Sequence, residues 1–238
     1  GAYQITERQM MDSRRAYCAN ISYLDDKIGE LLATLAACQF ERETVIVFCS
    51  DHGEMLGERG MWFKMSFLEG SARVPLMLHA PKRFLARRVT APVSTTEVAA
   101  MLLALARVDG GGLSGLAALA QGKLDDDRLV VAEYTAEGSI APMIMLRQGR
   151  WKFTHCPVDP DQLFDIAADP AERINRAADT DCAEVVARFR AIIRQRWDLA
   201  AFDTAVRESQ RNRLLIHAAL RHGTYYPWDF QPLQKASE

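Results

Sequence analysis

The chain has 238 residues, of which 49% are hydrophobic and 25% are charged, and its formal net charge is −2. This composition excludes an intrinsically disordered protein, which needs low hydrophobicity and high net charge. It also argues against a nucleic-acid-binding protein, because no positive field exists to attract phosphates. The longest apolar segments have the length of strands, and none approaches the roughly 18 residues that a membrane span needs.

The cysteines and the start of the chain bear on its location. Five cysteines lie at scattered positions, and no two form a C-x-x-C pair. This pattern predicts reduced thiols rather than a disulfide framework or a zinc site. The chain opens on Gly1-Ala2-Tyr3-Gln4, without the basic and apolar pattern of a secretory signal. We therefore expect a cytoplasmic protein, with a periplasmic location as the alternative if a signal lies upstream.

The first half of the chain predicts helices alternating with buried strands. Apolar residues recur at helical spacing over residues 8–38. Residues 44–49 are apolar and β-branched, which is typical of a central strand of a parallel sheet, buried on both faces. Residues 50–70 contain four glycines and are expected to form a loop. A second strand is expected over residues 74–79, and a helix that Ser94 opens with a capping-box pattern.

The second half predicts a small antiparallel sheet and two helices. Four short strand-like segments cover Leu129–Glu133, Pro142–Leu146, Arg150–His155 and Gln162–Asp165. Gln148-Gly149 suits a tight hairpin turn. Amphipathic helices are expected over residues 182–197 and 203–221, followed by an aromatic tail.

These elements predict an α/β fold, in which a mainly parallel central sheet with flanking helices precedes the small antiparallel sheet and its helices. The strand that should precede the first helix in a βαβ unit is absent, which indicates part of a larger protein. The expected domains are residues 1–127, the C-terminal part of the α/β domain; residues 128–223, the small sheet with helices; and residues 224–238, the tail.

Candidate chemistry follows the first predicted strand. Asp51 and His52 come directly after it, where ligands bind in open α/β sheets, and the pair can supply two ligands to a divalent cation. Taken alone, the pair fits better a strand-end turn with a capping aspartate. Lys64, flanked by Phe63 and Phe67, fits either a lysine that covers apolar surface or an ammonium that binds an anionic group beside the metal.

The order of several segments resembles a known family, the type I sulfatases of the alkaline phosphatase superfamily. The matching residues are Ser50-Asp51-His52-Gly53-Glu54, Lys64, Glu69-Gly70, Arg73-Val74-Pro75, Leu163-Phe164-Asp165-Ile166, Asp169-Pro170 and Glu172. Within the family, His52, the segments at 132–134 and 137–138 and the Tyr-Pro-Trp-Asp tail look most like the choline sulfatases. The resemblance implies an alkaline-phosphatase-like sandwich and hydrolysis of a sulfate ester, with choline sulfate as the expected substrate.

The resemblance also implies roles for individual residues. Asp51 and His52 match two ligands of a divalent metal, calcium before manganese or magnesium. Lys64 matches the lysine that holds a sulfate oxygen, so Lys64 and His52 are the expected catalytic residues. The family's nucleophile is a formylglycine made from the cysteine of a C-x-P-S-R motif, which none of the five cysteines fits. We therefore expect the nucleophile in an N-terminal half that this chain lacks, and no activity from this chain alone.

The expected leaving group, choline, is a quaternary ammonium without an N–H donor, so carboxylates and aromatic faces must hold it. Glu137, Trp228 and Asp229 are the expected substrate-binding residues, with Tyr225 and Tyr226 as further candidates. The aromatic tail fits equally well a segment that packs on the domain or on a neighbouring subunit. The resemblance implies a homo-oligomer, a dimer or tetramer, formed through this tail.

Two other functions also fit these residues. A phosphonate or phosphate monoester hydrolase of the same superfamily would use the same metal pair and the same anion-binding lysine. A non-catalytic binding or assembly module would keep the metal pair without a nucleophile and act through its tail.

Overall fold

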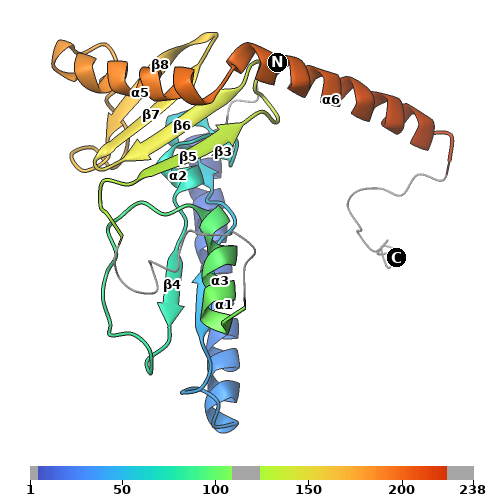
Figure 1. The fold of residues 1–238 in the computed structure, drawn as a ribbon. Coiled ribbons are helices and arrows are strands. Elements are labelled where there is room, and N and C mark those ends of the chain that lie inside the picture. The colour runs from blue at the N-terminus through green and yellow to red at the C-terminus, as the bar shows by residue number, and fades with distance from the viewer. Residues whose placement is uncertain (1–4, 109–123, 224–238) are drawn as a thin grey trace.

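The computed structural model describes residues 5–108 and 124–223 (Figure 1). The helices are α1 (Glu7–Ala37), α2 (Glu69–Ala72), α3 (Val98–Ala106), α5 (Ala183–Arg196) and α6 (Leu199–Leu220). The strands are β1 (Ile46–Cys49), β2 (Met55–Leu56), β3 (Trp62–Phe63), β4 (Leu76–His79), β5 (Leu129–Tyr134), β6 (Met143–Gln148), β7 (Trp151–Cys156) and β8 (Asp159–Asp165). Short 3₁₀ turns cover Glu58–Gly60, Thr95–Glu97 and Thr180–Cys182.

The long first helix is confirmed. Thr6 caps α1, and its side chain and that of Gln9 form a reciprocal capping box. No residue of α1 is buried, so its apolar side chains, such as Leu31, lie exposed. No helix in the described ranges is long and apolar enough to cross a bilayer.

The first strand differs from the expectation in its pairing and burial. β1 pairs with β4 in antiparallel register, with Phe48 opposite Met77, and no parallel neighbour lies among the described residues. Helix α3 covers one face of the pair, where its buried Met101 packs against Val47 and Leu78. β1 is half-buried rather than buried on both faces, because α3 covers only one face of the pair. On β4, Leu78 faces the helix and Met77 is exposed. The capping box at Ser94 is confirmed, with a 3₁₀ turn leading into α3.

The segment expected to be one long loop contains short elements. β2 and β3 form a hairpin in which Met55 pairs with Phe63, and α2 begins at Glu69. Strands of two residues give no alternating pattern, so the sequence could not indicate them.

The small antiparallel sheet is confirmed, with strand order β5-β6-β7-β8. Gly149 has φ 52° in the turn between β6 and β7, a backbone conformation that favours glycine. Leu146, Phe153 and Leu163 pair across three strands, share one face and are fully buried. Helix α5 covers this face, and the ring of Phe189 stacks on Phe153 with centroids 5.5 Å apart.

The opposite face of this sheet is also covered. Arg147, Lys152 and Phe164 lie directly opposite one another on adjacent strands, so their side chains project from that face. The guanidinium of Arg59 lies over the Phe164 ring, 5.2 Å from its centroid. The segment between β2 and α2 therefore packs on the sheet face that α5 leaves free (Figure 1).

Two hydrophobic clusters divide the described residues. One joins α3 to β1 and β4, and the other joins α5 to the small sheet. This separation supports a boundary near residue 127, but the division into residues 1–127 and 128–223 stays a prediction. The tail at 224–238 lies outside the described residues.

Asp165 ties the end of β8 to the β6–β7 turn and predicts an acid-sensitive fold. Its buried carboxylate accepts from Arg150 Nε at 2.8 Å and from the backbone N–H groups of Ala167 and Ala168. The Arg150 hydrogen bond, supported by those N–H groups, outweighs burial and lowers the pKa of Asp165 below its usual 3.8.

Because the folded-state pKa of Asp165 is depressed, its stabilising contribution is complete above pH 3.8 and is lost as the pH falls below that value. We expect Asp165→Asn to lower the free energy of unfolding at pH 7, with a gap to wild type that narrows below pH 3.8. Urea unfolding at a series of pH values checks this. A gap of constant size down to pH 2.5 or so would contradict it.

Candidate active site

The turn after β1 holds the first two candidate residues. The Asp51 carboxylate accepts from the backbone N–H of His52 at 2.9 Å, and Ser50 Oγ donates to the His52 carbonyl at 2.8 Å. The hydrogen bond from the His52 backbone N–H is the main reason that the pKa of Asp51 is lowered. Asp51 is therefore an anion at neutral pH, and its side chain is 83% exposed.

The hydrogen bonds of His52 fix its tautomer. Its Nδ1 lies 2.8 Å from the Gly53 carbonyl oxygen, which can only accept, so Nδ1 carries the proton. Its Nε2 then presents a lone pair, and Lys64 Nζ lies 3.0 Å away and donates to it. In this tautomer Nε2 is the acceptor in the contact with the ammonium.

Lys64 reaches His52 from a constrained backbone. Phe63 directly before it has φ 68°, a conformation rare for a bulky residue. The Lys64 carbonyl accepts from Ser71 Oγ at 2.5 Å and from the Ser66 N–H at 2.8 Å. The main chain at Lys64 is therefore held in place, while its side chain is exposed on the side of His52.

Backbone contact joins this turn to α2. The Gly53 N–H donates to the Ser71 carbonyl at 2.7 Å. A Cβ added at Gly53 would lie 2.2 Å from the Gly70 carbonyl oxygen, so only glycine allows this approach. A Cβ at Gly70 would in turn meet the buried Met55 sulfur at 2.8 Å.

The other candidate residues lie in two different places. Glu137 is exposed in the turn after β5, where its carbonyl accepts from the Tyr134 hydroxyl at 2.7 Å. The Tyr134 ring meets Phe67 edge-on at 6.3 Å, so this turn borders the segment that carries Lys64. Trp228 and Asp229, with the rest of the tail, lie outside the described residues.

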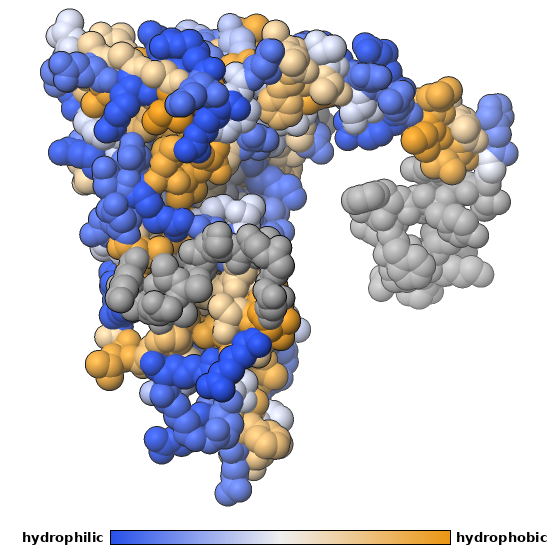
Figure 2. All heavy atoms as spheres, in the orientation of Figure 1, coloured by the Kyte–Doolittle hydropathy of each residue, from blue (hydrophilic) through white to orange (hydrophobic). Residues whose placement is uncertain are grey.

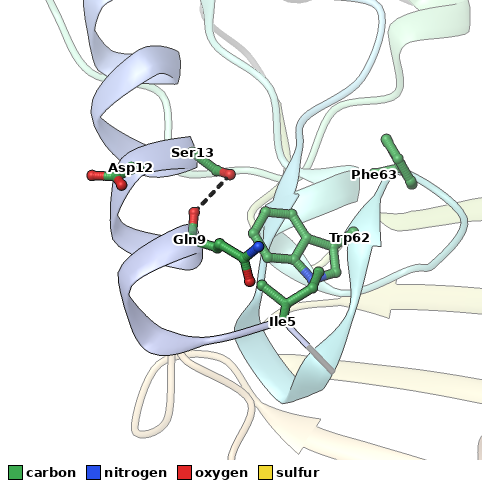
Figure 3. Close-up of a pocket in the computed structure, with 6 residues that line it drawn as sticks. All are labelled: Ile5, Gln9, Asp12, Ser13, Trp62 and Phe63. Carbon is green, nitrogen blue, oxygen red and sulfur yellow. Dashed lines mark hydrogen bonds between the residues drawn. The ribbon is translucent and has the colours of Figure 1, made fainter. Parts of the chain in front are cut away.

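A hollow in the described surface lies apart from this site. It lies between the start of α1 and β3, and Figure 3 shows Trp62 facing the first turn of that helix. Its lining residues are Ile5, Gln9, Asp12, Ser13, Trp62 and Phe63. None of them is a metal-binding pair or an ammonium, so the hollow adds no chemistry.

The donor atoms at residues 51 and 52 fit part of a metal site. Asp51 Oδ2 and His52 Nε2 lie 3.4 Å apart, as two ligands of one cation do when each bond is about 2–2.5 Å long. Two protein ligands make an incomplete set, so others must come from outside the described residues. A separate group at Asp179, Asp181 and Cys182 fits less well, because Arg176 already pairs with both carboxylates.

Three family models match parts of this chain. The "Sulfatase" profile matches residues 2–108, "N-sulphoglucosamine sulphohydrolase, C-terminal" matches residues 57–198, and "Choline sulfatase enzyme C terminal" matches residues 204–238. The chain belongs to the sulfatase family. The resemblance that the motifs carry is therefore confirmed.

Two known sulfatases and a phosphonate monoester hydrolase match most of this chain. A choline-sulfatase from Rhizobium meliloti (strain 1021) is 48% identical over 247 residues, covering 99% of this chain and 48% of that protein. A solved 2-O GAG sulfatase has a TM-score of 0.70 at 24% identity, covering 87% of this chain and 46% of that one. The phosphonate monoester hydrolase from Silicibacter pomeroyi has a TM-score of 0.70 at 25% identity, covering 82% and 42%.

These similarities confirm the α/β fold class, and they also show how long this sulfatase chain is relative to the proteins it matches. It spans about half the length of the choline-sulfatase and less than half of the two solved structures.

The sequence did not single out Lys152 as part of the site's surroundings. Lys152 is buried beside Glu69 and Glu172, both of which belong to the family motifs. The available signal was a lysine within the apolar strand Trp151–Cys156, on the face opposite Phe153. That signal cannot be told from an ordinary solvent-facing lysine of a two-sided sheet.

Gly53 provides a test of the backbone contact. We expect Gly53→Ala to destabilise this sulfatase chain by about 1–3 kcal/mol, the typical cost of overpacking, because the new methyl group collides with the Gly70 carbonyl. Urea unfolding measures the effect. Gly29→Ala in α1 is the control, since nothing lies within 4 Å of its Cβ position and alanine favours a helix. Equal stability of Gly53→Ala and wild type would contradict the contact.

Proposed function

We propose that the protein to which this chain belongs hydrolyses a sulfate ester, with choline sulfate as substrate, releasing choline and sulfate. The observation that carries this proposal is the convergence of Asp51, His52 and Lys64 at the end of β1, in a sulfatase chain. The 48% identity to a choline-sulfatase and the match of residues 204–238 to the choline sulfatase C-terminal family support the substrate.

Lys64 would bind an oxygen of the sulfate group. Its exposed ammonium is held beside His52 at 3.0 Å by a fixed main chain, so it is oriented before substrate arrives. A preorganised positive charge stabilises the negative charge that develops on oxygen in the transition state more than mobile water does. While no metal is bound, the Nε2 lone pair of His52 holds this ammonium near the site.

Asp51 and His52 would also hold the divalent metal that sulfatases use, and calcium is the proposed ion, with manganese and magnesium as alternatives. When bound, the metal supplies charge neutralisation and orients the reacting groups. The Nε2 lone pair that would ligate the metal is the one that accepts from Lys64 here, so the two contacts exclude each other. Lys64 is then free to turn to the anionic substrate.

The nucleophile is proposed to lie outside these 238 residues, because no cysteine in the sequence sits in a C-x-P-S-R motif. This matches the family's use of a formylglycine. It also means that the chain by itself releases no sulfate.

Glu137 is the proposed carboxylate for the substrate's cationic end. It is exposed in a turn that borders the Lys64 segment through the Tyr134–Phe67 contact. Glu133, the other carboxylate nearby, accepts from Trp197 Nε1 at 2.6 Å and is therefore engaged elsewhere. Trp228 and Asp229 are proposed as further substrate contacts on the strength of their sequence alone.

The substrate proposal is tested with the protein expressed from its complete reading frame. Choline sulfate, a phosphonate monoester and a phosphate monoester are compared at equal concentration. Fastest turnover of choline sulfate supports the proposal. Faster turnover of the phosphonate ester favours the hydrolase class of the Silicibacter pomeroyi neighbour, and no turnover of any ester favours a binding module.

Lys64→Ala in the complete protein tests the anion-binding role. We expect kcat/KM for choline sulfate to fall roughly 10²–10³-fold, which corresponds to about 2–4 kcal/mol of lost transition-state stabilisation. Lys27→Ala is the control, because Lys27 is an exposed lysine whose contacts stay within α1, with Glu30 at 2.7 Å and with the Tyr23 ring at 5.6 Å from its centroid. An unchanged kcat/KM in Lys64→Ala would refute the role. The wild-type 238-residue chain alone serves as the blank and should release no sulfate.

The C-terminal tail is the proposed contact in a homo-oligomer, a dimer or tetramer. Leu214, Leu215, Ile216 and Leu220 are exposed near the end of α6, and Figure 2 shows apolar surface gathered there. Large exposed apolar patches mark interaction surfaces. The same residues fall within the matched choline sulfatase C-terminal family.

Removing residues 224–238 tests the tail. We expect the otherwise complete protein without this tail to form smaller particles than wild type by light scattering, because the subunits lose the segment through which they associate. An unchanged number of subunits in each particle would rule out assembly through the tail.

The proposed location is the cytoplasm, with the periplasm as alternative. The support is the sequence pattern, in which five cysteines lie at scattered positions without a C-x-x-C pair. Cell fractionation with antibody detection checks this.

A further inference from the structure

A buried cluster of three charged residues joins the small sheet to the active-site segment. Lys152 Nζ donates to Glu69 Oε1 at 2.8 Å and lies 2.8 Å from Glu172 Oε1. The latter oxygen is out of line for a hydrogen bond, so this contact is an ion pair. The side chains of Lys152 and Glu172 are only 2% and 3% exposed, so water screens these charges little.

The cluster connects three distant parts of the chain. Lys152 lies on β7, on the sheet face opposite the α5 core, Glu172 follows β8, and Glu69 is the first residue of α2. The second oxygen of Glu172 accepts from the Glu69 N–H at 2.6 Å. Glu172 therefore holds the main chain at the start of α2, while Lys152 holds the side chain there.

The other contacts of this segment with the sheet include Arg59 on the Phe164 ring and Phe67 on the Tyr134 ring. A cavity of about 210 Å³ lies between them, with Met65, Gln162 and Lys152 among its lining residues. A hollow contact gives weaker apolar packing than a filled one. The charge cluster is thus a principal tether at this point.

Helix α2 passes the constraint on to the active site. Ser71, two residues after Glu69, donates to the Lys64 carbonyl through Oγ and accepts from the Gly53 N–H through its carbonyl. Gly53 accepts in turn from His52 Nδ1. A continuous series of contacts therefore leads from Lys152 to both Lys64 and His52.

We infer that Lys152 and Glu172 are positioning residues, which clamp α2 through Glu69 and thereby fix the main chain at Lys64 and Gly53 in the geometry that brings Lys64 and His52 together. Neither residue touches the proposed substrate or metal site. The inference rests on the proposed function only for its effect on turnover. The effect on the structure of the site can be measured separately.

The test uses the complete protein and the variant Lys152→Met, which keeps the side-chain bulk and removes the charge. Hydrogen–deuterium exchange is followed in peptides that cover residues 50–56 and 64–73. We expect exchange there to be at least about tenfold faster than in wild type, because α2 is released from the sheet. We also expect kcat/KM for choline sulfate to fall about 10²-fold, as small displacements of reacting groups do.

Two further variants separate positioning from general loss of stability. Arg190→Met removes another ion pair to a buried carboxylate, Asp161 at 2.6 Å, within the part of the sheet that packs on α5. It should leave exchange at residues 50–56 and kcat/KM unchanged. The double variant Lys152→Met with Glu172→Gln keeps an oxygen acceptor for the Glu69 N–H. It also leaves one carboxylate without its lysine, that of Glu69, where Lys152→Met alone leaves two. It should recover about tenfold of the lost kcat/KM, since an unpaired buried charge is the costlier defect.

The inference is overturned if Lys152→Met changes exchange at residues 50–56 no more than Arg190→Met does. If Lys152→Met fails to fold, the same comparison is made with the double variant, where faster local exchange supports the inference and equal exchange overturns it. Absence of turnover in wild type would count against the proposed function alone, because the exchange comparison still decides the role of Lys152.

Discussion

The close approach of two glycines is the constraint on which the active site depends. Gly53 directly follows Asp51 and His52 in the turn after β1, and Gly70 lies in the first turn of α2. Their main chains touch where any Cβ at Gly53 would meet a carbonyl oxygen at 2.2 Å. This contact brings the turn after β1 against α2, so that the residues between Gly53 and Gly70 must form a closed loop. Lys64 lies in that loop, and closure turns its ammonium toward His52.

Sequence reasoning predicted those parts of the fold that have a period or a cap. The long apolar spacing of α1, the capping box at Ser94 and the four strands of the small sheet all have local signals, and all are confirmed. The pairing of β1 has no local signal, because an apolar segment of six residues fits a buried parallel strand and a half-buried antiparallel one alike. The hairpin of β2 and β3 was missed since each strand has only two residues.

The sequence indicated the residues of the candidate site, but it did not indicate the residues that hold them in place. Asp51, His52 and Lys64 follow from motif order, and their convergence agrees with the roles proposed for them. Lys152 is different, because its burial results from a sheet covered on both faces. An alternating strand shows which residues share a face, yet it does not show what covers that face. Only the tertiary structure reveals that Glu69, at the start of α2 and more than eighty residues earlier in the chain, meets this lysine.

Phe63 limits how far this protein can be stabilised without affecting its chemistry. A bulky residue with φ 68° holds the main chain in a state that costs roughly 1–2 kcal/mol, so replacement by glycine would relieve that cost. Glycine at this position would also widen the range of backbone conformations open to the unfolded and folded chain alike. The neighbouring ammonium would then sample more orientations. Thermostability selection at residue 63 and selection for catalytic rate would therefore favour different amino acids.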